Sequence, residues 1–355
     1  MLERPVKTDA AAVALEVEAH AGVPAILDEV AESADPRHAF LRRAWFEAAG
    51  ERLTTLIATR ADGRAVAALP TYGAKPGLRA VPGSYWPFRS FPIAADASDA
   101  EVAAFLSAPA ARRTLGPVWR LGPVFDNDPA LARLIKAAPP SGWRVLKRHA
   151  GTSYGVDIAE ERKEGPWPRP STLKNIQKQE KRLAKLGSIG WRHIAGSGWT
   201  AAALDDLASI ERNSWVGIKS EGDPKFLHSE RRKGWETALA DPAIAELMTA
   251  GILFIDDEPV SFSFGINAGG TRYSIATSYD ERFARHSPGY VTGYRTYFDA
   301  VEAGVDVLNL GVGDGGAKTS MGAAPGPEMV DCLFVRNPLA AALLAPIWKR
   351  SGNRR

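Results

Sequence analysis

The sequence predicts a mixed α/β fold in which one arrangement of helices and strands occurs twice. Its 355 residues exceed the ~250–300 at which a single hydrophobic core usually stops growing. A helical stretch at 40–50 precedes a strand, a tight turn and a second strand at 53–73, and the same order recurs over 230–267. A single repeat of about half the chain indicates a tandem duplication, because solenoids repeat every ~20–50 residues.

Turn chemistry and alternation support both predicted hairpins. Asp62-Gly63 is a strong hairpin turn because both central residues can take positive φ. Asp256-Asp257 occupies the corresponding place in the second copy. Along 260–267, large apolar residues alternate with small or polar ones, which is typical of a half-buried strand.

Composition restricts the classes of function. Hydrophobic residues make up 45% and charged residues 24%, as in an ordinary folded protein, and a net charge of +3 argues against a protein that coats nucleic acid. The single Cys332 excludes an intramolecular disulfide framework, and its apolar surroundings indicate a buried strand. We expect no metal site.

The acidic residues among the first twenty spoil a secretory signal, and no stretch approaches ~20 apolar residues, so we expect a cytoplasmic protein.

Four segments are predicted along the chain. Residues 1–160 form an N-terminal domain, 161–170 a Pro- and Gly-rich linker, 171–336 a C-terminal domain and 337–355 a helix with a basic tail. Asn337-Pro338 is a good helix start, with a cap followed by proline in the first turn. The apolar helix after it either packs on the domain or lies on an anionic inner-leaflet surface with Trp348 at the interface.

The C-terminal domain opens with a basic helix over 171–186. Ser171 or Thr172 is expected to cap it, and leucine and isoleucine side chains form one face. Its other faces carry Lys174, Lys178, Lys181, Arg182 and Lys185 against a lone Glu180. This surface is either a solvated helix face or a docking surface for phosphates, an anionic sugar polymer or acidic headgroups.

A strand, a loop and a helix start at 273–291 have the pattern of an anion site. The predicted helix runs from Tyr290 to Ala303. The first N–H groups of a helix have no intrahelical acceptor and its dipole favours negative charge, so Gly289, Tyr290 and Val291 suit a pyrophosphate. Arg285 and His286, just upstream, add positive charge. By itself, Ser-Pro-Gly before a helix is also a common helix entry.

Residues 170–336 resemble a known family. The helix STLKNIQKQEKRLAKLG, the hairpin GILFIDDEPVSFSFGI, the segment YDERFARHSPGY and the strand end LNLGVGDG occur in its order and spacing. It is the GNAT-like acetyltransferase family associated with cellulose and exopolysaccharide biosynthesis (the CelD/BcsL type), related to FemAB-type peptidyltransferases. The resemblance implies tandem GNAT-like domains, with acyl-CoA (acetyl-CoA or another) as co-substrate. The first half, which lacks a counterpart of Ser-Pro-Gly-Tyr, is expected to be a degenerate copy without its own cofactor.

The resemblance also implies roles for individual residues. Arg285, Ser287, Gly289 and Tyr290 map to the phosphate-holding turn, although Arg285 and Gly289 form a shifted version of the usual signature. A backbone N–H at or near Ser278 would polarise the thioester carbonyl. Two carboxylates, those of Asp314 and Asp280, are expected to face one cleft, with Asp314 as base or acceptor-orienting group and Asp280 second. Lys318 matches a family lysine that follows an aromatic residue, here Ala317, and would stabilise an oxyanion or bind an anionic acceptor.

The function that follows is N- or O-acyl transfer from acyl-CoA to a sugar or polysaccharide precursor. Contact with the inner membrane or with polysaccharide-synthesis machinery is a further expectation. One alternative is FemAB-like transfer of an aminoacyl group from charged tRNA, the only interpretation with a nucleic-acid partner. Another is a non-catalytic accessory protein of a polysaccharide assembly.

Overall fold

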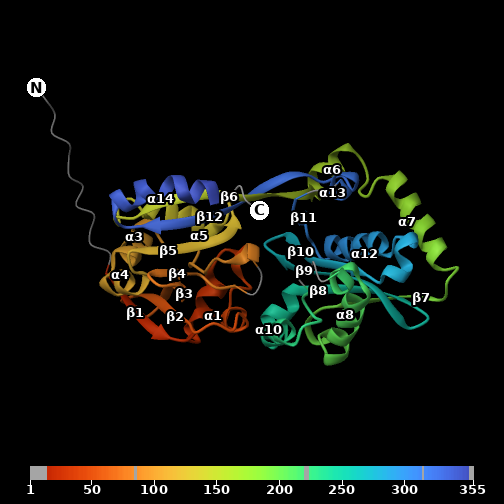
Figure 1. Ribbon diagram of the computed structural model, residues 1–355, viewed down its shortest axis with the longest axis horizontal. Helices are drawn as coiled ribbons and strands as arrows, with labels where there is room; N and C mark the ends of the chain where they lie inside the picture. Colours follow the sequence, from red (N-terminus) through yellow and green to blue (C-terminus); the bar gives the residue numbers. More distant parts are fainter. Residues whose placement is uncertain (1–13, 84–85, 220–223, 314–315, 352–355) are drawn as a thin grey trace, which may run out of the picture.

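The computed structural model describes residues 14–83, 86–219, 224–313 and 316–351. The strands of these residues form one twelve-stranded sheet in the order β1-β2-β3-β4-β5-β12-β6-β11-β10-β9-β8-β7 (Figure 1). The strands are β1 (Leu15–Ala21), β2 (Thr54–Arg60), β3 (Ala65–Lys75), β4 (Leu78–Ala80), β5 (Val118–Phe125), β6 (Arg144–Asp157), β7 (Ile189–Ile194), β8 (Met248–Ile255), β9 (Glu258–Ala268), β10 (Thr271–Tyr279), β11 (Val307–Val312) and β12 (Ala324–Val335).

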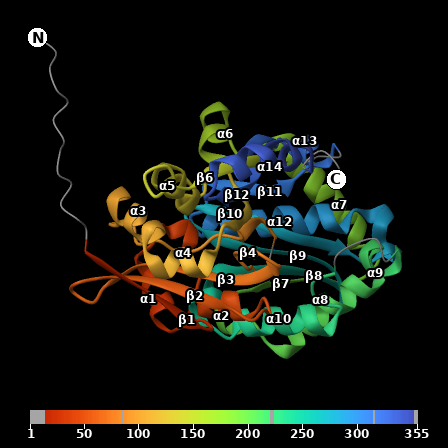
Figure 2. The same cartoon turned by 60° about the vertical axis from the view of Figure 1, so that its left-hand side comes forward.

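Helices cover both faces of this sheet (Figures 1 and 2). The α-helices are α1 (Ile26–Ser33), α2 (Arg43–Glu47), α3 (Asp99–Ser107), α4 (Pro109–Leu115), α5 (Pro129–Ala137), α6 (Ile158–Glu164), α7 (Pro170–Leu183), α8 (Ala201–Asn213), α9 (Trp215–Lys219), α10 (Ser229–Leu239), α11 (Pro242–Leu247), α12 (Pro288–Glu302), α13 (Ala317–Ser320) and α14 (Pro338–Ser351). Four short 3₁₀ helices are η1 (Pro36–His38), η2 (Trp86–Phe88), η3 (Gly196–Gly198) and η4 (Glu281–His286).

The predicted duplication is visible in the strand pairing. β1 to β4 pair antiparallel in sequence, and β4 then pairs with β5 in parallel. β7 to β10 repeat the antiparallel series, and β10 pairs with β11 in parallel. Each half therefore contains a meander that ends on one parallel pair.

The two halves exchange their last strands. β6 follows the first half in sequence but pairs with β11 of the second. β12 follows the second half but pairs with β5 of the first, and β12 and β6 pair with each other at the centre of the sheet. The division into segments 1–160, 161–170, 171–336 and 337–355 remains a prediction. In the structure, β12 of the C-terminal segment pairs with β5 of the N-terminal segment.

The core of the molecule crosses the boundary between the halves. One buried cluster contains Trp45 of α2 together with Trp235 of α10 and Phe264 of β9. On β8, Ile252 belongs to this cluster, whereas Leu253 packs with Val291 of α12 on the opposite face. This alternation separates the layer that contains α8 and α10 from the layer that contains α12.

Local sequence signals set most element boundaries. The observed bounds of α6, α7 and α12 differ from those predicted. Asp256 and Asp257 both take positive φ, as the predicted hairpin turn requires. The basic helix α7 begins at Pro170 with Arg169 as its N-cap, so neither Ser171 nor Thr172 caps it, and it ends at Leu183. α6 covers part of the predicted linker, and α12 begins two residues earlier than expected because Pro288 occupies its first turn.

The expected start of the C-terminal helix and the burial of the cysteine are confirmed. The side chain of Asn337 accepts hydrogen bonds from the N–H groups of Leu339 and Ala340 at 2.8 and 3.1 Å. Cys332 is buried on β12, where burial raises the pKa of its thiol to about 12. Within the described ranges, no helix combines the length and the apolar character needed to cross a membrane.

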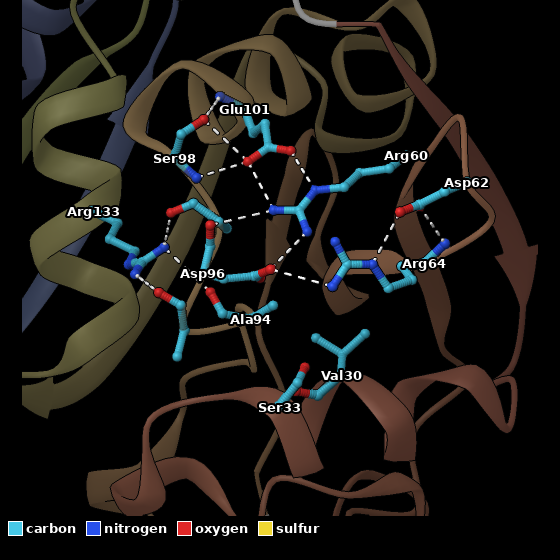
Figure 3. A network of polar contacts seen from close by, with 12 residues as sticks. Val30, Ser33, Arg60, Asp62, Arg64, Ala94, Asp96, Ser98, Glu101 and Arg133 are labelled. Atoms are coloured by element: carbon cyan, nitrogen blue, oxygen red, sulfur yellow. Dashed lines mark hydrogen bonds and ion pairs between the residues drawn. The ribbon is translucent and has the colours of Figure 1, made fainter.

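A network of charges fixes the helical segment between β4 and β5 (Figure 3). Ser98 and Glu101 form a complete capping box at the start of α3. The Glu101 carboxylate also accepts from Arg60 of β2 at 2.6 and 3.0 Å, and Asp96 accepts from Arg60 at 2.8 Å. The chain's own carboxylate thus occupies the N-terminus of α3.

Replacing Glu101 by glutamine is expected to lower the free energy of unfolding by about 1–2 kcal/mol at neutral pH, through loss of a charge-assisted pair. Hydrogen bonds from Arg60 lower the pKa of Glu101 to about 2 from the ordinary 4.5. This stabilisation is therefore complete above pH 4.5 and disappears as the pH falls towards 2. Denaturant titrations over that range test it, with Asp62→Asn at the exposed edge of the network as the control. A difference between wild type and Glu101→Gln that does not change with pH would contradict this assignment.

Candidate active site

The parallel pair β10–β11 opens partway along its length. The two strands pair only over Thr271–Tyr273 and Val307–Asn309. Immediately beyond, the pairing of β10 with β9 shifts register between Ser274 and Ala276, and that of β11 with β6 shifts between Asn309 and Val312. A strand that leaves its neighbour exposes backbone N–H and C=O groups to the gap, where a bound molecule can take the place of the missing strand.

Lys318 reaches this opening from α13. Its ammonium Nζ donates to the carbonyl oxygen of Val312 at 3.0 Å. A Cβ built on Gly311 would lie 3.7 Å from that Nζ and 3.8 Å from the carbonyl oxygen of Ser274. The half-buried lysine therefore places its charge where β10 and β11 separate.

The start of α12 lies at the end of β10, after the short helix η4. Ser287 is the N-cap in the left-handed region (φ 54°), and Pro288 fixes the first turn. Within the part of the chain that the structure describes, no side chain caps this helix. A Cβ on Gly289 would lie 2.9 Å from the ring of Tyr279, so glycine keeps the backbone close to the strand end.

The N–H groups at this helix start differ in their partners. Those of Tyr290 and Val291 donate to the carbonyl oxygen of Ser287 at 3.1 and 3.4 Å. The N–H of Gly289, one position earlier, has no intrahelical acceptor. Of the three donors expected for a pyrophosphate, two are thus engaged in the turn of this structure.

Asp280 is buried and tied to the loop that it begins. Its carboxylate accepts from the backbone N–H of Arg282 at 2.8 Å and from the guanidinium at 2.7–3.1 Å. Burial raises the pKa of Asp280, but hydrogen bonds from Arg282, with a further one from Asn213, more than offset this and hold it below its usual range. These contacts fix η4 and through it the start of α12.

The other residues predicted for the site lie in different environments. Ser278 is buried, and its carbonyl oxygen accepts from the hydroxyl of Ser261 at 3.0 Å. Arg285 is exposed and donates to the His286 ring at 3.0 Å. Asp314 lies outside the described residues. The roles of all the predicted site residues remain predictions.

The basic helix α7 lies against α12, in the opposite direction. Leu183 packs with Val291 near the start of α12, and Ile176 packs with Tyr297 further along it. Glu180, the single acidic residue of α7, accepts from Arg295 of α12 at 2.8 Å. The outward face of α7, next to the first turns of α12, therefore carries cations without an acid among them: Lys174, Lys178, Lys181, Arg182 and Lys185.

A cleft of about 1080 Å³ separates the halves on the α10 side of the sheet. From the first half, Glu47 to Gly50, Gly83 and Arg89 line it, and α10 with the residues just before it lines the other wall. The cationic side chains are Arg89, Lys225, Arg231 and Lys233, with His228 beside them. Next to Arg89, the Phe88 ring contacts Tyr273 at 5.1 Å between centroids, and Tyr273 is the last β10 residue paired with β11.

Sequence reasoning missed this cleft and one buried cation. Arg272 of β10 is fully buried, and its guanidinium donates to Asn267 at 3.1 Å and to the hydroxyl of Thr249. Burial lowers its pKa to about 10. An arginine in the alternating strand RYSIATSY was the available signal. The cleft had none, because its walls come from separate stretches of sequence.

Comparison with known proteins gives the class of this fold. Residues 170–319 match the family model described as acetyltransferase (GNAT) domain. The chain is a transferase whose mixed sheet is built from tandem GNAT-like halves. A comparison with curated proteins gave no match.

Solved structures resemble the chain over nearly its whole length. FemX aligns with a TM-score of 0.60 at 10% identity, covering 90% of this chain and 97% of that one. The C-terminal domain of a putative lysylphosphatidylglycerol synthetase from Agrobacterium fabrum aligns at 0.56 and 14%, covering 92% and 94%. L-PGS from Bacillus licheniformis aligns at 0.52 and 13%, covering 94% and 97%. These likenesses establish the fold that both halves form together.

Proposed function

We propose that the protein transfers an acyl group from acyl-CoA to an amine or hydroxyl of a sugar or polysaccharide precursor. The observation that carries this proposal is the uncapped start of α12 beside the opening between β10 and β11, with Lys318 in the gap. The helix start suits the diphosphate of acyl-CoA, and the opening between the strands suits its thioester-bearing arm. The CelD/BcsL-type resemblance supports the choice of acceptor.

The chemistry requires a base for the acceptor's proton, donors to the oxyanion and a proton for the leaving thiolate. The acceptor nitrogen or oxygen attacks the thioester carbonyl carbon, the C–S bond breaks, and the thiolate takes up a proton. Backbone N–H groups of β10 near Ser278 and the ammonium of Lys318 would stabilise the oxyanion. Asp314 remains our proposed base. For Asp280 we propose a positioning role, since a carboxylate bound by Arg282 with a lowered pKa is a weak base.

For the acceptor we propose the cleft between the halves. Arg89, which lines the cleft, follows Phe88 in the sequence, and the buried Phe88 ring contacts Tyr273 on the face of the sheet opposite to α12. Donor and acceptor could thus approach the opening from the two faces. The surplus of cationic side chains along the cleft favours an acceptor that carries phosphate or carboxylate groups.

The continuous basic face of α7 favours a second candidate, aminoacyl transfer from charged tRNA. Lysines spaced along one helix face suit successive backbone phosphates, and this face lies beside the proposed donor turn. Both candidates share the turn and differ in the size of the donor that occupies it.

Calorimetric titration of the full chain with CoA, acetyl-CoA and pantetheine tests the proposal. We expect dissociation constants on the order of micromolar for the first two. We expect much weaker binding of pantetheine, which lacks the phosphates. No binding of CoA or acetyl-CoA would exclude the acyl-CoA mechanism. If charged tRNA then bound, and Lys178→Glu with Lys181→Glu abolished that binding, the second candidate would replace it.

A further inference from the structure

The C-terminal helix α14 presents an apolar stripe to solvent. Leu339, Leu343 and Ile347 recur every four residues and therefore share one side of the helix. Their exposed fractions are 75, 73 and 65%, the largest among the large hydrophobic side chains of the described chain. The residues between them on this side are Ala342 and Pro346, so the outward face carries no polar side chain before Lys349.

The opposite face of α14 is already packed. Ala341 and Leu344 contact the cluster formed by Leu333 and Val335 of β12. Trp348, which the membrane alternative placed at the interface, turns inward: its indole N–H donates to the carbonyl oxygen of Asp331 at 3.3 Å, and Arg148 stacks on its ring at 3.9 Å. The helix is therefore held in place without its outer leucines, and the stripe is not a core face that failed to pack.

The charges around the stripe have one sign. From Asn337 to Arg355 the sequence contains no acidic residue. Lys349 and Arg350 end the helix, and Arg354 and Arg355 follow in the sequence. An apolar helix face with cations at its end complements a surface that offers hydrocarbon beneath negative headgroups.

We propose that α14 docks the protein on an anionic phospholipid bilayer, with Leu339, Leu343 and Ile347 inserted at the level of the headgroups. A second copy of the chain would match the apolar stripe but not the charge, because the helix and its tail offer no carboxylate to the partner's cations. In both views α13, which carries Lys318, lies along the same edge of the molecule as α14 (Figures 1 and 2). Docking through α14 would therefore bring the α13 side of the molecule near the lipid.

Co-sedimentation of the full chain with vesicles tests this proposal. We expect binding to vesicles of phosphatidylcholine mixed with phosphatidylglycerol, weakened by salt, and little binding to phosphatidylcholine alone. The double variant Leu343→Ser/Ile347→Ser is expected to bind at least about tenfold more weakly, because two large aliphatic side chains no longer leave water. Lys349→Glu/Arg350→Glu is expected to lose the preference for phosphatidylglycerol.

Ile218→Ser is the matched control, since Ile218 is 63% exposed on α9 and lies outside the stripe. It should bind vesicles as the wild type does. The proposal would be overturned if the wild type did not bind the vesicles, or if Leu343→Ser/Ile347→Ser bound them as strongly as the wild type. Sedimentation equilibrium identifies the alternative occupant: a wild-type dimer that the double variant dissociates, without vesicle binding, would assign the stripe to a second copy.

Discussion

Replacing Lys318 by methionine is expected to lower the turnover number by about 10²–10³-fold, because it removes one preorganised donor from the developing oxyanion. Methionine keeps much of the side-chain length and removes the charge from the opening between β10 and β11. The Nζ contact with the Val312 carbonyl oxygen would be lost as well, so a small loss of stability is expected.

Thiol release from acetyl-CoA, with a soluble amino sugar as acceptor, measures this effect. Lys174→Met on the outward face of α7 is the control, because it removes an equivalent charge at the end of that helix away from the donor turn. The dissociation constant for CoA should change by less than about threefold in Lys318→Met. A Lys318 variant with wild-type turnover would remove this residue from the mechanism.

The second large effect is expected at Gly289. A glutamate there would crowd the ring of Tyr279, which a Cβ already approaches to 2.9 Å, and would place a negative charge at the helix start. We expect an affinity for CoA at least about 100-fold lower, equivalent to about 2.7 kcal/mol of binding free energy.

Gly289→Ala separates the two causes, because it adds the crowding without the charge. We expect the affinity of Gly289→Ala for CoA to lie between the affinities of the wild type and Gly289→Glu. Calorimetry on all three proteins measures this. Circular dichroism spectra would show that each variant is folded. If the glutamate and alanine variants both bound CoA as the wild type does, the start of α12 would not hold the phosphates.

Local patterns in the sequence predicted the parts of the fold that local chemistry controls. The Asp256-Asp257 turn and the cap at Asn337 each depend on residues within one element or two. The alternation along β9 predicted a half-buried strand and was wrong on this point, because Ser261 and Ser263 on its other face are buried as well. The exchange of β6 and β12 could not be predicted in this way. Strands of similar apolar character can pair with several neighbours, and only packing of the whole sheet selects the partner.

In the site, too, the features that depend on neighbouring residues could be predicted, and those that depend on packing between distant segments could not. Ser-Pro-Gly at the start of α12 was readable because proline and glycine mark backbone geometry directly. The approach of Lys318 to Gly311 depends on how α13 folds back on β11, and the carboxylate of Asp280 is bound by Arg282 through a turn that sequence does not fix. The cleft between the halves brings together side chains about 140 residues apart, such as Arg89 and Arg231, and no sequence pattern joins them.

A crystal structure of the full chain with CoA bound would test the central claim most directly. We expect the diphosphate within hydrogen-bonding distance of the N–H of Gly289, next to Arg285, with the pantetheine arm entering the opening between β10 and β11 towards Lys318. A CoA molecule bound elsewhere, such as in the cleft lined by α10, with the start of α12 unoccupied, would contradict it.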